Sequence, residues 1–231
     1  MVHRDSMISA LDPVFAGTVG QTPNLNQANG NGAVASADAV YECYLYALVL
    51  KAMHELQYNI KAVPSGTGPF VFRRGRGNLF TLKRSCSLVE FSAHGTDYEL
   101  LCDVKTSCRS PNVDLEVDIL VIPKQHSDDC AKKMRSPSFD QLKLLIEAKH
   151  FVVGVDVTTS KSFVGSCDRL REASCVASLV TSGTNSSNSK LLLGGVNPPI
   201  DLYSNVYGDP NSGTEARNFV EFLKSKLPKV L

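Results

Sequence analysis

The chain has 231 residues, 43% of them hydrophobic, which is typical of one large domain with its own core. The 24 basic and 23 acidic side chains give a net charge of +1, which excludes a broadly cationic nucleic-acid coat but not a local basic groove. No apolar run reaches the roughly 18 residues of a membrane span, and no basic-then-apolar secretion signal opens the chain, so no contact with a membrane is expected.

The seven cysteines indicate a reducing compartment. Their number is odd, no two of them form a CxxC pair, and several lie in apolar runs. We expect reduced, mostly buried thiols in a cytoplasmic protein. The cysteines and the five histidines never cluster at ligand spacing, so a structural zinc site is not expected.

Residues 1–36 differ in composition from the rest of the chain. They contain GTVGQTPNLNQANGNGAVAS, a stretch rich in Gly, Asn and Gln that buries little surface. We predict a flexible N-terminal arm over 1–36 and a single folded domain over 37–231.

The first predicted helix runs from about Ala39 to Leu56, with Ser36 or Asp38 as its N-cap. Its first turns, AVYECYLYALVL, are apolar nearly all round, which predicts a buried helix rather than an amphipathic one. Glu42 is the only charged residue in those turns. Two interpretations are open: a partner at a metal site, or a solvated glutamate that favours the helix dipole.

A turn-rich segment follows from Asn59 to Lys83, where prolines and glycines punctuate short strands or a loop. The densest basic cluster of the chain lies here and includes Arg73, Arg74 and Arg76, with Lys83 and Arg84 nearby. Such a cluster is a candidate clamp on a nucleic-acid backbone. The alternative is a solvated hairpin tip.

The remaining elements predict an α/β fold with a mixed central β-sheet flanked by helices on both faces. Two antiparallel strands lead into a third, and a polar loop or short exposed helix precedes the fourth. A helix, a strand, a Ser/Gly/Asn loop, an edge strand and a closing helix follow. The first three strands are expected at Ser87–Phe91, Tyr98–Thr106 and 113–122, and the loop or short helix at 123–141. The later helix is expected at Thr158–Glu172, the strand at Ser174–Thr181 and the loop at Ser182–Ser189. The edge strand is expected at Pro199–Tyr207 and the closing helix at Gly213–Leu227.

Two of the apolar strands carry acid where a core strand normally does not. The first places Asp118 before ILVI, and the second follows LLI with Glu147, Ala148 and Lys149. Because side chains alternate along a strand, Glu147 and Lys149 point to one face and Ala148 to the other. If the strands are neighbours, Asp118, Glu147 and Lys149 converge. Two carboxylates and a lysine suit Mg²⁺-assisted hydrolysis of a phosphodiester.

This arrangement resembles the PD-(D/E)XK nuclease superfamily, which has the restriction-endonuclease-like fold. The resemblance covers about 38–181 and rests on Glu42 in the first helix, Asp118 on one strand and Glu147-Ala148-Lys149 on the next. It implies that Asp118, Glu147 and the Ala148 carbonyl bind the metal, that Lys149 orients and activates the attacking water, and that Glu42 supports the metal or its waters. The chain departs from the pattern at Val117, where the family has proline.

The sequence thus leads us to expect a Mg²⁺-dependent endonuclease, with Mn²⁺ able to substitute, acting on DNA rather than RNA. The family analogy fits restriction, repair or anti-phage defence. Specificity would come from loops, a homodimer or a partner protein. The alternatives are a non-catalytic nuclease-like module that binds nucleic acid, and an interaction protein in which Glu147 and Lys149 merely pair.

Overall fold

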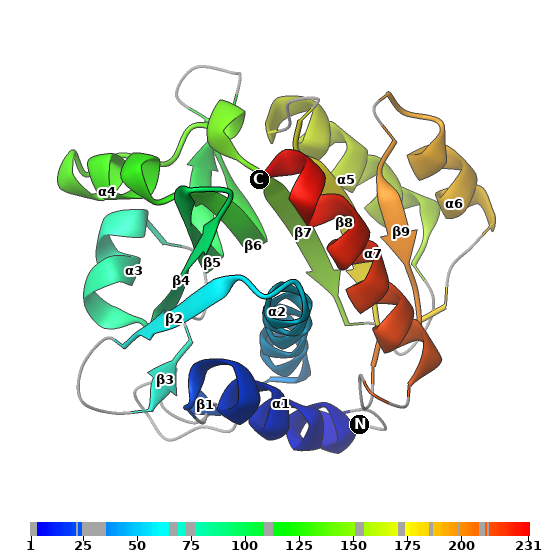
Figure 1. Cartoon of the computed structure of the whole chain (residues 1–231). Coiled ribbons are helices and arrows are strands. Elements are labelled where there is room, and N and C mark those ends of the chain that lie inside the picture. The colour runs from blue at the N-terminus through cyan, green and yellow to red at the C-terminus, as the bar shows by residue number, and fades with distance from the viewer. Residues whose placement is uncertain are drawn as a thin grey trace.

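The computed structural model describes residues 4–21, 23–24, 36–64, 69–72, 77–108, 113–150, 155–170, 174–184, 187–197, 199–207, 211 and 213–231. Its main feature is a seven-stranded sheet with the order β2-β4-β5-β6-β7-β8-β9. Helices lie on both faces of this sheet (Figure 1). The predicted α/β class, with a mixed central sheet flanked by helices, is therefore confirmed.

The pairs from β2 to β7 are antiparallel, whereas β7 pairs with β8, and β8 with β9, in parallel. The strands are β2 (Asn59–Val63), β4 (Leu88–Ala93), β5 (Thr96–Ser107), β6 (Asp114–Pro123), β7 (Leu144–Lys149), β8 (Val176–Thr181) and β9 (Asp201–Tyr203). The two acidic strands, β6 and β7, are neighbours as predicted, with Ile119 opposite Ile146. A separate short parallel pair joins β1 (Pro23–Asn24) to β3 (Phe70–Val71).

The helices form one layer on each face of the sheet, and each layer has its own core. On one face lie α1 (Arg4–Val19), α2 (Ala37–Glu55) and α7 (Thr214–Val230). On the other lie α3 (Leu79–Ser85), α4 (Lys124–Lys132), α5 (Val157–Leu170) and α6 (Ser187–Gly194). A short 3₁₀ turn, η2 (Phe139–Gln141), precedes β7. Because side chains alternate along a strand, successive apolar residues of the central strands pack into one core and then the other.

Helix α2 is buried between the sheet, α1 and α7 (Figure 1), which confirms the sequence prediction. It begins at Ser36, whose hydroxyl accepts the backbone N–H of Ala39 at 3.3 Å. Its apolar residues are covered on all sides, from Val40 to Met53. Glu42, in the first turns of this helix, is half-buried among these apolar residues.

The structure corrects the prediction of a flexible arm for part of residues 1–36. Arg4–Val19 forms α1, and Met7, Leu11 and Phe15 of this helix are fully buried against α2. These three residues have the i, i+4, i+8 spacing of a helix face, a signal that the Gly- and Asn-rich text farther along obscured. Most of that text, residues 25–35, lies outside the described residues.

Two further helices were not predicted. Helix α3 lies in the segment expected to form strands or a loop, and α6 begins inside the expected Ser/Gly/Asn loop. Both are too short to be stable alone, and helices of this length depend on tertiary packing. Leu82 of α3 and Leu193 of α6 supply that packing, since both are buried in the core on their face of the sheet.

Two expectations about the molecule as a whole can be compared with the structure. None of the seven cysteines forms a disulfide, and all except the half-buried Cys86 are buried, as expected. Among the described helices, none combines the length and the apolar character that crossing a bilayer requires.

Candidate metal centre

The predicted convergence of Asp118, Glu147 and Lys149 occurs where the pairing of β6 with β7 ends. Ile119 and Ile146 form the outermost pair of this ladder, and Asp118 and Glu147 are the next residues on each strand. The Lys149 Nζ lies 2.6 Å from Glu147 Oε1 and 3.9 Å from Asp118 Oδ2. One ammonium group thus faces both carboxylates.

Asp118 is held by the backbone of the neighbouring strand. Its Oδ2 accepts the N–H of Ala148 at 2.7 Å, so a side chain replaces the carbonyl that a regular ladder would supply. The N–H and C=O of one strand residue point toward the same neighbouring strand. The Ala148 carbonyl therefore faces the β6 side, where the family resemblance assigns it as a metal ligand.

Two further carboxylates join Asp118: Glu42 from α2 and Asp103 from β5. One oxygen of each of the three side chains lies within 4.8 Å of the other two. The structure therefore brings Glu42 to the strands that carry the predicted site, as the metal-site interpretation of Glu42 required. Asp103 is an addition, since the sequence analysis did not select it.

The backbone of β5 changes conformation at Asp103. The flanking pairs, Cys102 with Ile119 and Val104 with Val117, place Asp103 opposite Asp118. Asp103 has a φ of 52°, in the left-handed region that few non-glycine residues adopt. Cys102 belongs to the core beside α2, whereas Val104, which strict alternation would place with it, belongs to the opposite core. The left-handed residue thus reverses the alternation of the strand at the point where the Asp103 carboxylate meets Glu42.

Burial and mutual repulsion shift the pKa values of this cluster. Burial, followed by the neighbouring Asp103 and Asp118, raises the pKa of Glu42 to about 9. Burial and the charge of Glu147 raise the pKa of Asp118 to about 7, against the opposing effects of Lys149 and the Ala148 N–H. Burial lowers the pKa of Lys149, but Glu147 and Asp118 outweigh it and raise that pKa overall. The two carboxylates thus favour the ammonium form of Lys149.

The donor set of the cluster fits a hard divalent cation. Mg²⁺ binds oxygen at about 2.1 Å, so the oxygens of one octahedral shell lie within about 4.2 Å of each other. The three carboxylates are close to that spacing. Three carboxylates in a buried site cannot all be ionised without compensation, so they take up either protons or a cation. Oxygen ligands favour Mg²⁺ or Mn²⁺ over the softer metals that thiolates select.

Asp103 could have been found by the signal that identified Glu147. Both are acids that directly follow or interrupt apolar residues of a strand, here LLCDV. In the structure Glu147 is bonded to Lys149 and does not belong to the three-oxygen cluster. Its predicted role as a metal ligand stays a prediction, while its observed contact is with the lysine.

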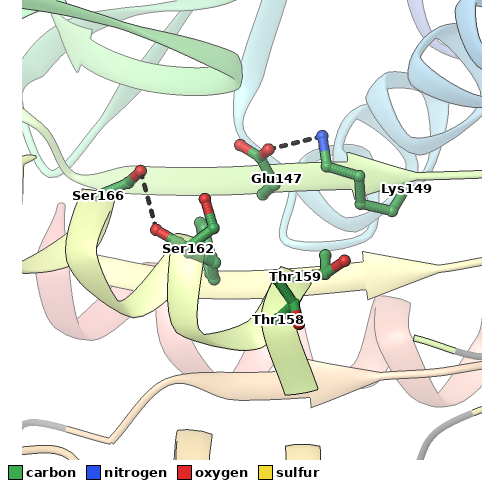
Figure 2. A pocket seen from close by; sticks show the side chains of 7 residues that line it. Glu147, Lys149, Thr158, Thr159, Ser162 and Ser166 are labelled. Carbon is green, nitrogen blue, oxygen red and sulfur yellow. Dashed lines mark hydrogen bonds and ion pairs between the residues drawn. The ribbon is translucent and has the colours of Figure 1, made fainter. Parts of the chain in front are cut away.

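A pocket of about 280 Å³ lies beside the candidate metal centre, between β7 and α5 (Figure 2). Glu147 and Lys149 form its β7 wall. Four hydroxyl-bearing residues of α5 and the ring of Phe163 form the rest: Thr158, Thr159, Ser162 and Ser166. A small polar ligand in this pocket would touch the candidate catalytic lysine directly.

The predicted basic clamp is only partly visible. Arg73, Arg74 and Arg76 lie outside the described residues. The ammonium group of Lys83 is bound to Glu99 at 2.7 Å and to Asp128 as well, so Lys83 holds elements together and is not available to a phosphate.

The other basic residue near this cluster, Arg84, stacks its guanidinium 4.2 Å from the centre of the Phe80 ring.

In comparisons with known proteins, no family model matches the chain and no curated sequence is significantly similar to it. The geometry of the site therefore carries the functional inference.

Proposed function

We propose that this chain is a Mg²⁺-dependent endonuclease that hydrolyses phosphodiester bonds of DNA, with Mn²⁺ able to replace Mg²⁺. One observation carries the proposal: Glu42, Asp103 and Asp118 meet within 4.8 Å of one another beside Lys149, which Glu147 holds at 2.6 Å. A cation site next to a fixed ammonium group is the apparatus that phosphoryl transfer requires.

The order of the elements supports the resemblance to the PD-(D/E)XK superfamily and its restriction-endonuclease-like core. A buried helix, α2, carries Glu42 and comes before an antiparallel run of β5, β6 and β7. Asp118 lies on β6, and Glu147 and Lys149 lie on β7. The following helix, α5, leads to β8, which is parallel to β7. This is the succession that the resemblance assigned to residues 38–181.

Each side chain has a distinct part in the proposed reaction. Glu42, Asp103 and Asp118 would hold the cation, together with the Ala148 carbonyl and Glu147 on the family assignment. A bound divalent cation would stabilise charge on the phosphate and lower the pKa of a coordinated water. Lys149 would orient the attacking water and donate a hydrogen bond to the phosphate as negative charge develops. Glu147 would keep the lysine ammonium in that position.

The proposal includes a need for partners. One chain offers a single candidate centre among its described residues, whereas cutting both strands of a duplex takes two. A second copy of the chain or a partner protein would provide the second cut and the specificity. A role in restriction, repair or anti-phage defence is part of the same proposal and rests on the family analogy.

Cleavage of supercoiled plasmid DNA by the purified chain tests the proposal. We expect cleavage with Mg²⁺ or Mn²⁺, none with EDTA, and a loss of about a hundredfold or more in the Lys149→Ala variant. Lys133→Ala, which removes an exposed lysine at the end of α4, should cleave like the parent chain. Full activity in Lys149→Ala would refute the assigned site.

The ion pair between Glu147 and Lys149 favours one competing interpretation, a protein-interaction module without catalysis. In that case the pair would be structural and the neighbouring acids would stay protonated. Calorimetric titration with Mn²⁺ separates the two interpretations. Absence of binding, together with absence of cleavage, would favour the interaction module.

A further inference from the structure

The pocket between β7 and α5 has a composition that the proposed cation site does not explain. Its wall on α5 combines the Phe163 ring with hydroxyl-bearing residues, of which Thr158, Ser162 and Ser166 are spaced four residues apart along the helix. The adjoining side of α5 is apolar, and its Phe163 and Cys167 are buried in the core. Helix α5 is thus anchored in the core by Phe163 and Cys167, and Phe163 also contributes to the pocket lining.

Ser162 is the best placed of these groups to meet a ligand. It projects from α5 toward β7, where Glu147 and Lys149 lie (Figure 2). The hydroxyl of Ser166 is already donated to the Ser162 carbonyl at 3.2 Å. Thr159 is engaged with Asp156, which also accepts its backbone N–H at 2.7 Å. Among the described residues, no protein group hydrogen-bonds the Ser162 hydroxyl.

The charges around the pocket restrict the kind of ligand. Glu147 and Lys149 neutralise each other at 2.6 Å, so the lining has no net charge. Hydroxyl groups can donate to a phosphate oxygen, and such bonds to an anion are stronger than bonds between neutral groups. Contacts of serine and threonine with phosphate position a nucleic acid without reading its sequence.

We infer that this pocket binds the backbone phosphate next to the one that is cleaved, with the Ser162 hydroxyl as its donor. The inference rests on the proposed nuclease function and names the part of the substrate that the chain grips. It makes the hydroxyl face of α5 a sequence-independent binding surface beside the metal centre.

The test measures duplex oligonucleotide binding by fluorescence anisotropy in EDTA, where no cleavage occurs. Ser162→Ala should raise Kd about tenfold, the effect of one hydrogen bond to a charged group. Ser162→Thr keeps the hydroxyl and should restore binding. Because no charge is removed, the dependence of Kd on salt should keep its slope. Ser85→Ala, which removes an exposed hydroxyl on α3, is the matched control.

A chemical change in the DNA supplies the second half of the test. A methylphosphonate at one linkage at a time removes a single backbone charge. At the linkage held by the pocket, this substitution and Ser162→Ala should not add, because both remove the same contact. Unchanged duplex binding by Ser162→Ala would overturn the assignment.

Failure of the pocket and failure of the nuclease proposal give different results. Cleavage that needs Mg²⁺ and Lys149 but is indifferent to Ser162 overturns the pocket alone. Binding that depends on Ser162, in a parent chain that never cleaves, overturns the nuclease proposal and supports the phosphate pocket.

Discussion

At the scale of single residues, the site depends on acids placed where the sequence otherwise demands apolar side chains. Asp118 is 9% exposed and Asp103 is 4% exposed, so neither is a surface carboxylate. Asp103 also adopts a backbone conformation that costs about 1–3 kcal/mol for a non-glycine residue. Strain and buried charge at one point are typical of a site kept for function rather than for stability.

Metal titration distinguishes the carboxylates that the structure brings together from the one that the family resemblance adds. Asp103→Asn should weaken Mn²⁺ binding by about tenfold to a hundredfold, because it removes one oxygen charge from the cluster. Glu147→Gln should have the smaller effect on affinity, because Glu147 contacts Lys149 and not the cluster.

Isothermal titration calorimetry at one pH measures both variants, with Glu215→Gln, an exposed acid on α7, as the control. A larger loss in Glu147→Gln than in Asp103→Asn would show that the cation lies nearer to β7. The ligand set would then be the one that the resemblance implies.

At the scale of elements, α1 and α2 determine how Glu42 reaches the sheet. Phe15 of α1 packs against Tyr46 of α2 and against Phe70 and Phe72, with ring centroids 5.2 to 6.3 Å apart. Without this cover the apolar face of α2 would be exposed to water. Helix α1 is therefore part of the support of the candidate site.

Truncation of this contact should destabilise the whole chain. Phe15→Ala should lower the free energy of unfolding by about 3–5 kcal/mol, the usual cost of removing a buried aromatic ring. Asp12→Ala, at an exposed position of the same helix, should change it by less than about 0.5 kcal/mol. Urea denaturation measures both, and equal stability of the two variants would restore the flexible-arm interpretation.

At the scale of the whole molecule, the metal-free site makes stability depend on pH. Glu42 and Asp118 have raised pKa values in the folded chain, about 9 and about 7, so the folded state holds protons that the unfolded state releases. The free energy of unfolding should therefore fall as the pH rises from about 5 to about 9, by on the order of a few kcal/mol. Carboxyls with lowered pKa values, such as Asp128, act in the opposite direction at lower pH.

Denaturation in EDTA at several pH values between 5.5 and 8.5 checks this prediction. Glu42→Gln should reduce the loss of stability toward high pH, because the amide does not ionise. Added Mn²⁺ should also reduce it, because the cation replaces the protons. Stability that is independent of pH in the parent chain would contradict the prediction.

Local signals in the sequence were sufficient for much of this result. An N-cap followed by a long apolar stretch predicted α2, a closing helix was expected where α7 lies, and apolar runs predicted the central strands. The same reasoning selected Glu42, Asp118 and Lys149, since each is a charge in an apolar context. It did not find α1, α3 or α6, whose stability comes from contacts made only after the chain has folded.

The sequence by itself determined which charged residues lie in apolar segments, and it determined the α/β class of the fold. Only the tertiary structure decided which charges meet, because register and backbone conformation fix side-chain direction and neither is encoded in residue type. Asp103 shows this most clearly. Its place opposite Asp118 follows from the pairing of β5 with β6. At its left-handed backbone the side chain lies beside Glu42, which belongs to a helix some sixty residues earlier in the chain.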